Sequence, residues 1–277
     1  MKVGFIGLGH AGGALASTLL RNKVDLTVRE LDRVAAQRFL DGGAAWGDSP
    51  KAMATQCDFV ITCLPSPAAS AAVVEAEDGL LAGARPGSIW LEMSTTDTEE
   101  IKRLAAKFDA KGAHAVDCPV SGGVHRAATG NISIFAGCER AVFERILPVL
   151  KILGRRILHT GPVGSAATLK AMTNYLATAN LLTLCEALVT MKAADLDLAT
   201  TYEAIRISSG NSFVHETESQ VILNGSRDIS FSMDLVQKDI GFFQKTAEAH
   251  GVPLEISPLM IEIFRDGQKR YGERANS

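Results

Sequence analysis

Lys170 and Asn174 are side chains that could act together, the lysine in proton transfer and the amide in orienting its partner. They are four residues apart in a segment from Ser165 to about Ala194 that contains no Gly or Pro. This segment is predicted to form one long helix, on which residues four apart share a face. A lysine whose pKa is lowered towards neutrality by partial burial and nearby positive charge can serve as a general base and a general acid. A solvated helix face would show the same spacing, so the pair alone leaves both interpretations open.

A glycine-rich segment at the start of the chain predicts a dinucleotide site. It follows a short apolar run, Lys2–Ile6, and precedes a helical pattern. In this context Gly7 allows the tight turn, Gly9 lets a pyrophosphate approach the backbone, and Gly12 lets helix and strand pack closely. The N–H groups of the helix start are free to bind phosphate. The residues predicted to contact the dinucleotide are Gly7, Leu8, Gly9, His10, Ala11 and Gly12. His10 has an alternative interpretation as an ordinary helix-surface histidine.

Glu30 ends the second apolar run, eighteen residues after Gly12. An acidic side chain at about this distance binds the hydroxyls of the adenosine ribose. Its carboxylate also repels a 2′-phosphate, so the sequence favours NAD over NADP as the cofactor. Arg29 and Arg33 flank Glu30 and could weaken this preference, and a solvated surface glutamate is the alternative.

The elements that must position these residues change in type near Gly161. Before it, short apolar runs alternate with helical stretches, which predicts a mostly parallel sheet covered on both faces. The predicted strands are Lys2–Ile6, Leu26–Val28, Phe59–Leu64, Ser88–Glu92, Ala115–Asp117, Ser133–Ala136 and Arg156–His159. Two helix starts are readable, Ser49-Pro50 and a capping box from Thr96 to Glu99.

After the long helix, only helical patterns follow. They lie near Thr200–Ser208, Val214–Leu223, Met233–Ala249 and Glu255–Tyr271, separated by Gly and Pro. The predicted fold class is therefore α/β: a doubly wound sheet, then an all-α domain joined to it by a long helix. We predict a dinucleotide-binding domain at residues 1–162 and an all-helical substrate and oligomerisation domain at residues 163–277.

Four segments in this order resemble the β-hydroxyacid dehydrogenases, whose members include 3-hydroxyisobutyrate dehydrogenase and tartronate semialdehyde reductase. The segments are Gly4–Gly9, Asp117–Gly123, Gly161–Gly164 with Lys170 and Asn174, and Leu235–Asp239. The resemblance implies a Rossmann-type domain, an all-helical domain and an active site in the cleft between them. Three positions depart from the family pattern: His10-Ala11 replaces two apolar residues, Glu92 replaces a usual Asp, and His125-Arg126 replaces residues that are more often small.

The resemblance also implies the roles of the site residues. Lys170 would be the general base in oxidation and the general acid in reduction, and Asn174 would orient Lys170 and the substrate hydroxyl. Ser121, Gly122 and Gly123 would bind the substrate carboxylate. Lys238 would lie near both cofactor and substrate, and Leu64, Pro65 and Thr95 would contact the cofactor. His125 and Arg126 either tune the substrate or are solvated loop residues.

The implied activity is hydride transfer between NAD and the terminal alcohol or aldehyde of a small β-hydroxy acid. An imine reductase and a non-catalytic NAD-binding module of the same fold are alternatives, but both usually lack the lysine that stands here at position 170. A 6-phosphogluconate-type enzyme would need more basic residues and a longer chain. The substrate remains open among short hydroxy carboxylates.

Composition limits the partners and the location. The 277 residues are 47% apolar and 21% charged, as in a globular protein of one or two domains. A net charge of −3 and 6% aromatic residues argue against nucleic-acid binding. Five widely spaced cysteines without a CxxC pair indicate reduced thiols in the cytoplasm and no metal site. The sequence has no uninterrupted run of about 18 apolar residues, so no membrane-spanning helix is predicted. The length of the long helix and the resemblance predict a homodimer or homotetramer.

Overall fold

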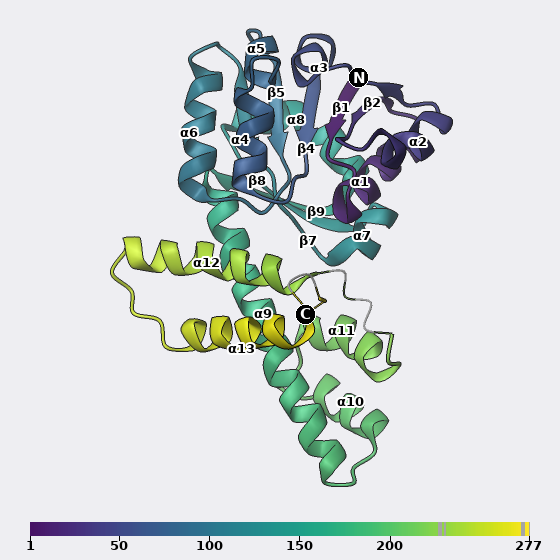
Figure 1. Cartoon of the computed structure of the whole chain (residues 1–277), viewed down its shortest axis with the longest axis vertical. Coiled ribbons are helices and arrows are strands. Elements are labelled where there is room, and N and C mark those ends of the chain that lie inside the picture. Colours follow the sequence, from purple (N-terminus) through teal and green to yellow (C-terminus); the bar gives the residue numbers. More distant parts are fainter. Residues whose placement is uncertain (227–228, 230, 273–274, 277) are drawn as a thin grey trace. The chain divides into compact units, whose positions relative to one another are not determined.

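The chain folds into two compact units, Met1–Lys170 and Ala171–Ser277, in a computed structural model (Figure 1). The structure describes residues 1–226, 229, 231–272 and 275–276. The first unit contains the sheet and the helices that cover it, and the second is built from helices, as the sequence predicts. The long helix α9 (Ser165–Ala193) begins in the first unit and continues into the second.

The sheet has mostly parallel strands, with antiparallel pairing on one side. The described strands are β1 (Lys2–Ile6), β2 (Asp25–Arg29), β3 (Ala45–Trp46), β4 (Phe59–Thr62), β5 (Ile89–Glu92), β6 (His114–Asp117), β7 (Val120–Ser121), β8 (Ile132–Gly137) and β9 (Gly154–Gly161). Their order is β3-β2-β1-β4-β5-β6-β8-β7, and β9 pairs with β8. Strands β6 and β7 are antiparallel to β8, and the other pairs are parallel.

The helices follow the strands as crossovers and then form the second unit. They are α1 (His10–Arg21), α2 (Arg33–Asp41), α3 (Pro50–Gln56), α4 (Pro67–Glu75), α5 (Leu80–Gly83), α6 (Thr98–Asp109), α7 (Gly123–Thr129), α8 (Arg140–Leu153), α9, α10 (Leu198–Arg206), α11 (Phe213–Leu223), α12 (Met233–Ala249) and α13 (Ile256–Tyr271).

Successive strand residues enter opposite cores, which makes the sheet doubly wound. In β4, Ile61 packs with residues of α1, α2, α7 and α8, whereas Val60 packs with residues of α3, α4, α5 and α6. The same alternation holds in β5, where Leu91 and Trp90 belong to the two different cores. Both faces are covered, and this explains why the strands read as continuous apolar runs rather than alternating patterns.

The carboxyl ends of four neighbouring strands are in register. Ile6 pairs with Thr62, Thr62 with Glu92, and Glu92 with Asp117. The turns that follow these residues therefore leave the sheet along one edge. This is the edge at which ligands bind in open α/β sheets.

Three local predictions need correction. The two-residue strands β3 and β7 were not predicted, because two residues are too short to show a period of two. The N-cap of α6 is Asp97 rather than Thr96, since the Asp97 carboxylate accepts from the N–H groups of Glu99 and Glu100. The predicted strand Phe59–Leu64 ends at Thr62.

The second unit is organised around α9, α12 and α13. Val236, Ile240, Met260 and Phe264 form its first core, and Figure 1 shows α12 beside α13. A second small core joins α9 to α11 through Leu184, Leu188 and Val214. Among the described residues, α9 is the one helix whose length and composition would allow a membrane crossing. Length and composition do not decide the matter, because long helices of soluble domains meet the same criterion.

Candidate active site

The turn after β1 has the close approaches that its glycines permit. Gly7 has a φ of +94°, and a Cβ there would lie 2.3 Å from the carbonyl oxygen of Cys63. A Cβ on Gly12 would lie 2.1 Å from the carbonyl oxygen of Gly7, so helix α1 packs directly onto the turn. Gly9 differs, because a Cβ there would meet nothing within 4 Å. The absence of a Cβ at Gly7 and Gly12 therefore permits the close packing of the turn, while Gly9 faces open space.

Glu30 braces this turn from the end of β2. One carboxylate oxygen accepts from the Leu8 N–H at 2.6 Å, and the other accepts from the Leu31 N–H at 2.7 Å. Each oxygen retains a second lone pair with which to accept a hydroxyl. Glu30 therefore orders the loop and presents a negative charge beside it.

The two arginines that flank Glu30 are held on Trp46. The guanidinium of Arg33 lies 4.9 Å from the indole ring centre and that of Arg29 lies 5.8 Å from it. Arg29 also donates to the carbonyl oxygens of Gly47 and Asp48 at 2.8 and 2.6 Å. Both cations are engaged on the side of strand β3, and Arg29 is further fixed by two hydrogen bonds.

A buried glutamate joins the next two turns of the same edge. The Leu64 N–H donates to the Ser94 hydroxyl oxygen at 2.7 Å, and the Ser94 hydroxyl donates to Glu92. Glu92 also accepts from the Ser94 N–H at 2.9 Å. Burial raises the pKa of the Glu92 carboxyl. The turn with Leu64 and Pro65 and the turn with Thr95 are thus fixed to each other.

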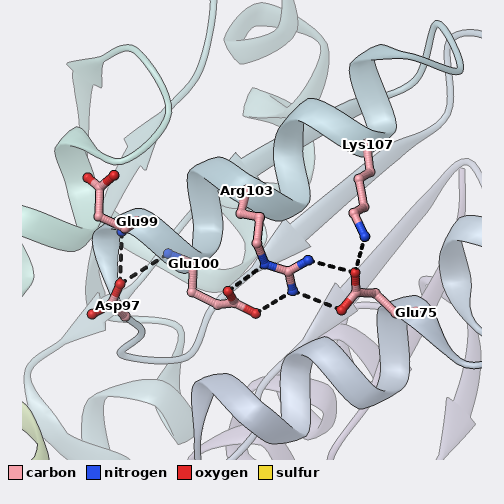
Figure 2. A network of polar contacts seen from close by, with 6 residues as sticks. All are labelled: Glu75, Asp97, Glu99, Glu100, Arg103 and Lys107. Atoms are coloured by element: carbon pink, nitrogen blue, oxygen red, sulfur yellow. Dashed lines mark hydrogen bonds and ion pairs between the residues drawn. The ribbon is translucent and has the colours of Figure 1, made fainter.

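Surface charges join the helices that leave these two turns (Figure 2). Arg103 of α6 makes paired contacts with Glu75 of α4, at 2.7 and 2.8 Å, and with Glu100, at 2.7 Å each. Lys107 adds a second cation at Glu75. These contacts connect α4 to α6 on the outside of the unit, whereas Glu92 and Ser94 connect their preceding turns inside it.

The loop Ser121–Gly123 has the backbone geometry that its glycines predict. Gly122 and Gly123 have φ values of +124° and +81°, which side chains other than hydrogen rarely adopt. Ser121 lies in β7, and α7 begins at Gly123. The stem of Arg126 packs on this loop, since its Cδ lies 3.0 Å from the position of a Cβ on Gly122. His125 is exposed. Of the two unusual residues, Arg126 is the one placed against the loop.

Lys170 is buried in the first turns of α9, with 6% of its surface exposed. The helix start is tied to the sheet, because the Ala167 N–H donates to the Asp117 carboxylate at 2.8 Å. The hydroxyls of Thr98 and Thr168 also meet at 3.0 Å. The lysine is therefore carried by a fixed helix end at the carboxyl edge of the strands.

Asn174 follows one turn later on α9, within the second unit. Its side-chain nitrogen donates to the Asp239 carboxylate at 2.5 Å, which fixes the orientation of the amide. The other Asp239 oxygen accepts from the Lys238 ammonium at 2.6 Å. Asp239 is 2% exposed, so a buried carboxylate holds two of the predicted site residues together.

The cysteines and the possible metal ligands give no competing site. All five cysteines are free thiols, and burial raises the pKa of Cys63, beside the Leu64 turn, to about 12. A thiol with such a pKa is protonated at neutral pH and is a poor nucleophile. Across the described residues, no group of three or more His, Cys, Asp or Glu side chains could hold a metal ion.

Two family models match consecutive parts of the chain. The NAD binding domain of 6-phosphogluconate dehydrogenase matches residues 2–161, and the NAD-binding region of NADP-dependent 3-hydroxyisobutyrate dehydrogenase matches residues 164–277. The chain belongs to the β-hydroxyacid dehydrogenase family. As a β-hydroxyacid dehydrogenase, it is an oxidoreductase that transfers a hydride between a nicotinamide cofactor and a small hydroxy acid.

Relatives align with nearly the whole chain. It is 32% identical over 269 residues to 2-(hydroxymethyl)glutarate dehydrogenase of Eubacterium barkeri, covering 97% of this chain and 89% of the relative. It is 31% identical over 281 residues to an NAD-dependent L-serine dehydrogenase of Pseudomonas aeruginosa, covering 99% and 94%. A solved structure of Psf3 in complex with NADP+ and 2-OPP is 26% identical, with a TM-score of 0.92 and coverage of 99% and 96%.

Three carboxylates support the site without having been predicted as site residues. Glu92, Asp117 and Asp239 are all buried, and each accepts from a residue of a site turn or helix. The sequence places Glu92 and Asp117 at the ends of apolar strands, where an acidic residue is unexpected. That position was the available signal. Asp239 belongs to the family-like segment Leu235–Asp239, but it lies in a polar helical stretch whose sequence does not reveal that this carboxylate is buried.

Proposed function

We propose that this β-hydroxyacid dehydrogenase oxidises the terminal alcohol of a small β-hydroxy acid with NAD and that Lys170 is the general base. The burial of Lys170 at the anchored start of α9 carries this proposal. Ser121, Gly122 and Gly123 bind the substrate carboxylate through the Ser121 hydroxyl and the exposed N–H groups of the two glycines. Leu64, Pro65 and Thr95 contact the cofactor, and Lys238 lies near cofactor and substrate. These placements follow the family pattern.

The chemistry divides between the cofactor and the chain. When bound by the glycine turn and Glu30, NAD would supply the acceptor for the hydride that leaves the alcohol carbon. Lys170 Nζ takes the hydroxyl proton as the carbonyl forms, so its neutral form is required for oxidation and its ammonium form for reduction. Asn174, fixed by Asp239, orients Lys170 and the hydroxyl.

Replacement of Lys170 tests this role. Lys170→Ala should lower kcat for oxidation by about 10²–10⁴-fold, the range expected for general-base catalysis, while the Kd for NAD changes little. Lys192→Ala, which removes an exposed lysine of the same helix, is the matched control. Full turnover by Lys170→Ala with NAD across a set of 3-hydroxy acids would contradict the mechanism. Turnover of imines but not of alcohols by the unmodified enzyme would favour the imine reductase alternative.

The preference for NAD over NADP is carried by Glu30 and by the arginines beside it. The Glu30 carboxylate repels a 2′-phosphate, and the guanidinium groups of Arg29 and Arg33 are already engaged with the Trp46 ring. Direct titration should give a lower Kd for NAD than for NADP. Glu30→Gln keeps one acceptor oxygen for the Leu8 N–H but removes the negative charge, so it should narrow the difference between the Kd for NAD and the Kd for NADP. Tighter binding of NADP than NAD by the unmodified enzyme would refute this preference.

Arg126 favours a substrate with a second anionic group. Its stem rests on Gly122, so its guanidinium, two bonds beyond Cδ, lies close to the carboxylate loop. A guanidinium binds carboxylate and phosphonate groups through paired hydrogen bonds. The relative named for 2-(hydroxymethyl)glutarate acts on a dicarboxylate, which agrees with this proposal.

Paired substrates test the role of Arg126. A 2-(hydroxymethyl) dicarboxylate should have a lower KM than 3-hydroxyisobutyrate or serine in the unmodified enzyme. Arg126→Gln should raise the KM of the dicarboxylate by about tenfold, the loss of one charge-assisted hydrogen bond, and should spare the monocarboxylates. His125→Gln is the control from the adjacent exposed position. An equal effect of Arg126→Gln on both substrate classes would contradict the proposal.

A second copy of the chain is proposed to cover an apolar face of α13. Ile256, Leu259 and Ile263 share that face and are exposed, at 59%, 58% and 42%. Only 17% of the most apolar stretch of α9 is buried within the chain. We infer a homodimer or homotetramer, which light scattering after gel filtration would detect. Leu259→Glu should shift the mass towards the monomer, and a monomeric unmodified protein would overturn the inference.

The cytoplasm is the proposed location, with no membrane or nucleic acid as partner. Five free cysteines fit a reducing compartment. Fractionation of cells that express the tagged protein would test this location, and recovery in the membrane fraction would contradict it.

A further inference from the structure

Asp117 connects two parts of the site in the first unit: the loop Ser121–Gly123 and the start of α9, which carries Lys170. It is the last residue of β6 and is fully buried. The chain then continues through Pro119 and Val120 into the loop Ser121–Gly123. The side chain points elsewhere, to the start of α9, where it accepts from the Ala167 N–H.

The first turn of a helix has N–H groups without partners inside the helix. The Asp117 carboxylate supplies an acceptor for this turn from a distant strand, in the way that an N-cap residue normally does from the adjacent position. The N–H groups of Gly164, Ala166 and Ala167 all favour its charged form, although burial raises the pKa of this carboxyl overall. Lys170 follows three residues after Ala167.

The surroundings fix the carboxylate tightly. Gly137 pairs with Asp117 across β6 and β8, and a Cβ on Gly137 would lie 2.2 Å from its second oxygen. That oxygen is buried and has no hydrogen-bond partner in the described part of the chain. The carboxylate is therefore held through its other oxygen, which accepts from the Ala167 N–H.

We propose that Asp117 is a positioning residue that fixes Lys170 relative to the carboxylate loop Ser121–Gly123. Oxidation requires the lysine nitrogen within hydrogen-bond reach of a hydroxyl whose carboxylate is held by the loop. Both groups are anchored through one residue, so the loop and the helix keep their separation. The inference rests on the proposed roles of Lys170 and the loop.

Replacement of the anchor should lower kcat and spare binding. Asp117→Ala frees the first turn of α9, and a displacement of about 1 Å at the lysine is expected to lower kcat by up to about 100-fold. The KM for the hydroxy acid and the Kd for NAD should change little, because the loop and the glycine turn remain. Asp117→Asn keeps an oxygen acceptor for Ala167 and should retain kcat within about fivefold, the value of a neutral hydrogen bond.

Two further variants keep the test decisive. Gly137→Ala leaves the carboxylate in the sequence but displaces it, so it should reproduce the loss of kcat if Asp117→Ala does not fold. Asp197→Ala removes the N-cap of α10, where Asp197 accepts from the Thr200 N–H at 2.8 Å, and should lower stability without lowering kcat.

Hydrogen exchange separates this inference from the proposed function. Amides in the first turn of α9 should exchange faster in Asp117→Ala than in Asp197→Ala, whatever the substrate. Unchanged exchange at Ala167, or kcat within threefold of the unmodified enzyme in a folded Asp117→Ala protein, would overturn the anchor. A parallel loss of NAD affinity would show general damage and would also overturn it. If exchange responds but Lys170→Ala keeps full activity, the proposed function fails and the anchor stands.

Discussion

The carboxylates of this chain fall into two regions with different surroundings. On the outside, between α4 and α6, Arg103 forms ion pairs with Glu75 and Glu100, and Lys107 forms one with Glu75 (Figure 2). These side chains are in contact with water. Inside, Glu92 and Asp239 are almost fully buried and bind backbone, hydroxyl or amide groups of the site turns and helices. The outer group has more charge contacts, yet the inner group determines the positions of the predicted site residues.

The difference follows from the solvent. Exposed ion pairs gain little, because water screens the charges and ordering the side chains costs entropy. A buried carboxylate has lost its hydration, so removing it leaves its donors without any acceptor. We therefore expect replacement of a buried carboxylate to lower the free energy of unfolding more than replacement of a residue in the exposed ion pairs.

The largest effect is expected at Asp239. Asp239→Ala leaves the Asn174 amide and the Lys238 ammonium without their shared acceptor. Breaking such a buried pair should lower the free energy of unfolding by about 3–5 kcal/mol, measured by urea denaturation. Asp239→Asn keeps one acceptor and should lose less. If Asp239→Ala lowered the free energy of unfolding by less than removal of an exposed ion pair does, the proposed difference between buried and exposed carboxylates would be wrong.

Glu92 should show a smaller effect with a defined pH dependence. Its carboxyl has a raised pKa in the folded chain, so the folded state holds the proton more strongly than the unfolded state. Stability should then fall as pH rises above about 4.5, the model value for a glutamate carboxyl, through the raised pKa. Glu92→Gln should remove this dependence, which unfolding curves at several pH values would show. If the unmodified protein and Glu92→Gln had the same dependence of stability on pH, the raised pKa of Glu92 would not be its cause.

The Glu92 carboxyl also orders the cofactor turns. Glu92→Ala removes the acceptor of the Ser94 N–H and hydroxyl, so the Kd for NAD should rise several-fold and the unfolding free energy should fall by about 1–3 kcal/mol. Titration with NAD measures the first and urea denaturation the second. Unaltered NAD affinity would separate Glu92 from the cofactor site.

Arg103 should give a smaller effect despite its four short contacts. Arg103→Ala removes the ion pairs with Glu75 of α4 and with Glu100 of α6 itself, and should lower the free energy of unfolding only slightly, because both pairs are exposed to water. The loss should shrink further at high salt. kcat should not change. A lower kcat in Arg103→Ala would show that these exposed ion pairs also help to position the catalytic residues.

The smallest effect on stability is expected at Glu75, and only at acidic pH. Arg103 and Lys107 lower the pKa of Glu75 to about 2. Since the pKa is lower in the folded chain, the contribution of Glu75 is present above about 4.5 and is lost as pH falls towards 2. Glu75→Gln should therefore unfold with a slightly flatter pH dependence than the unmodified protein between those values.

The sequence predicted most of the fold, because its signals are local. Apolar runs, the glycine turn after the first strand and the long helix from Ser165 without Gly or Pro each leave a pattern within a short window. Each predicted strand and the long helix are present, although the strand predicted at Phe59–Leu64 ends at Thr62. The two-residue strands and the Asp97 cap were missed, since the first leave no pattern and Thr96 offered a competing cap.

The predicted site residues came from the glycine motif with Glu30 and from the resemblance to the β-hydroxyacid dehydrogenases, and their roles remain predictions. What spacing could not reveal is long-range support. Glu30 reaches back 22 residues to Leu8, Asp117 reaches forward 50 residues to Ala167, and Asp239 meets Asn174 across 65 residues. No local pattern encodes such contacts, because they exist only after the sheet and helices have packed.

The placement of Trp46 gives the molecule an optical reporter. The chain has two tryptophans. Trp90 is buried against Phe108 and donates its ring N–H to Thr62, so its emission should stay blue-shifted and constant. Trp46 lies half-buried under Arg29 and Arg33, beside β2, whose last residue Arg29 precedes Glu30. In a Trp90→Phe protein, fluorescence would therefore follow a single indole next to the adenosine end of the proposed cofactor site.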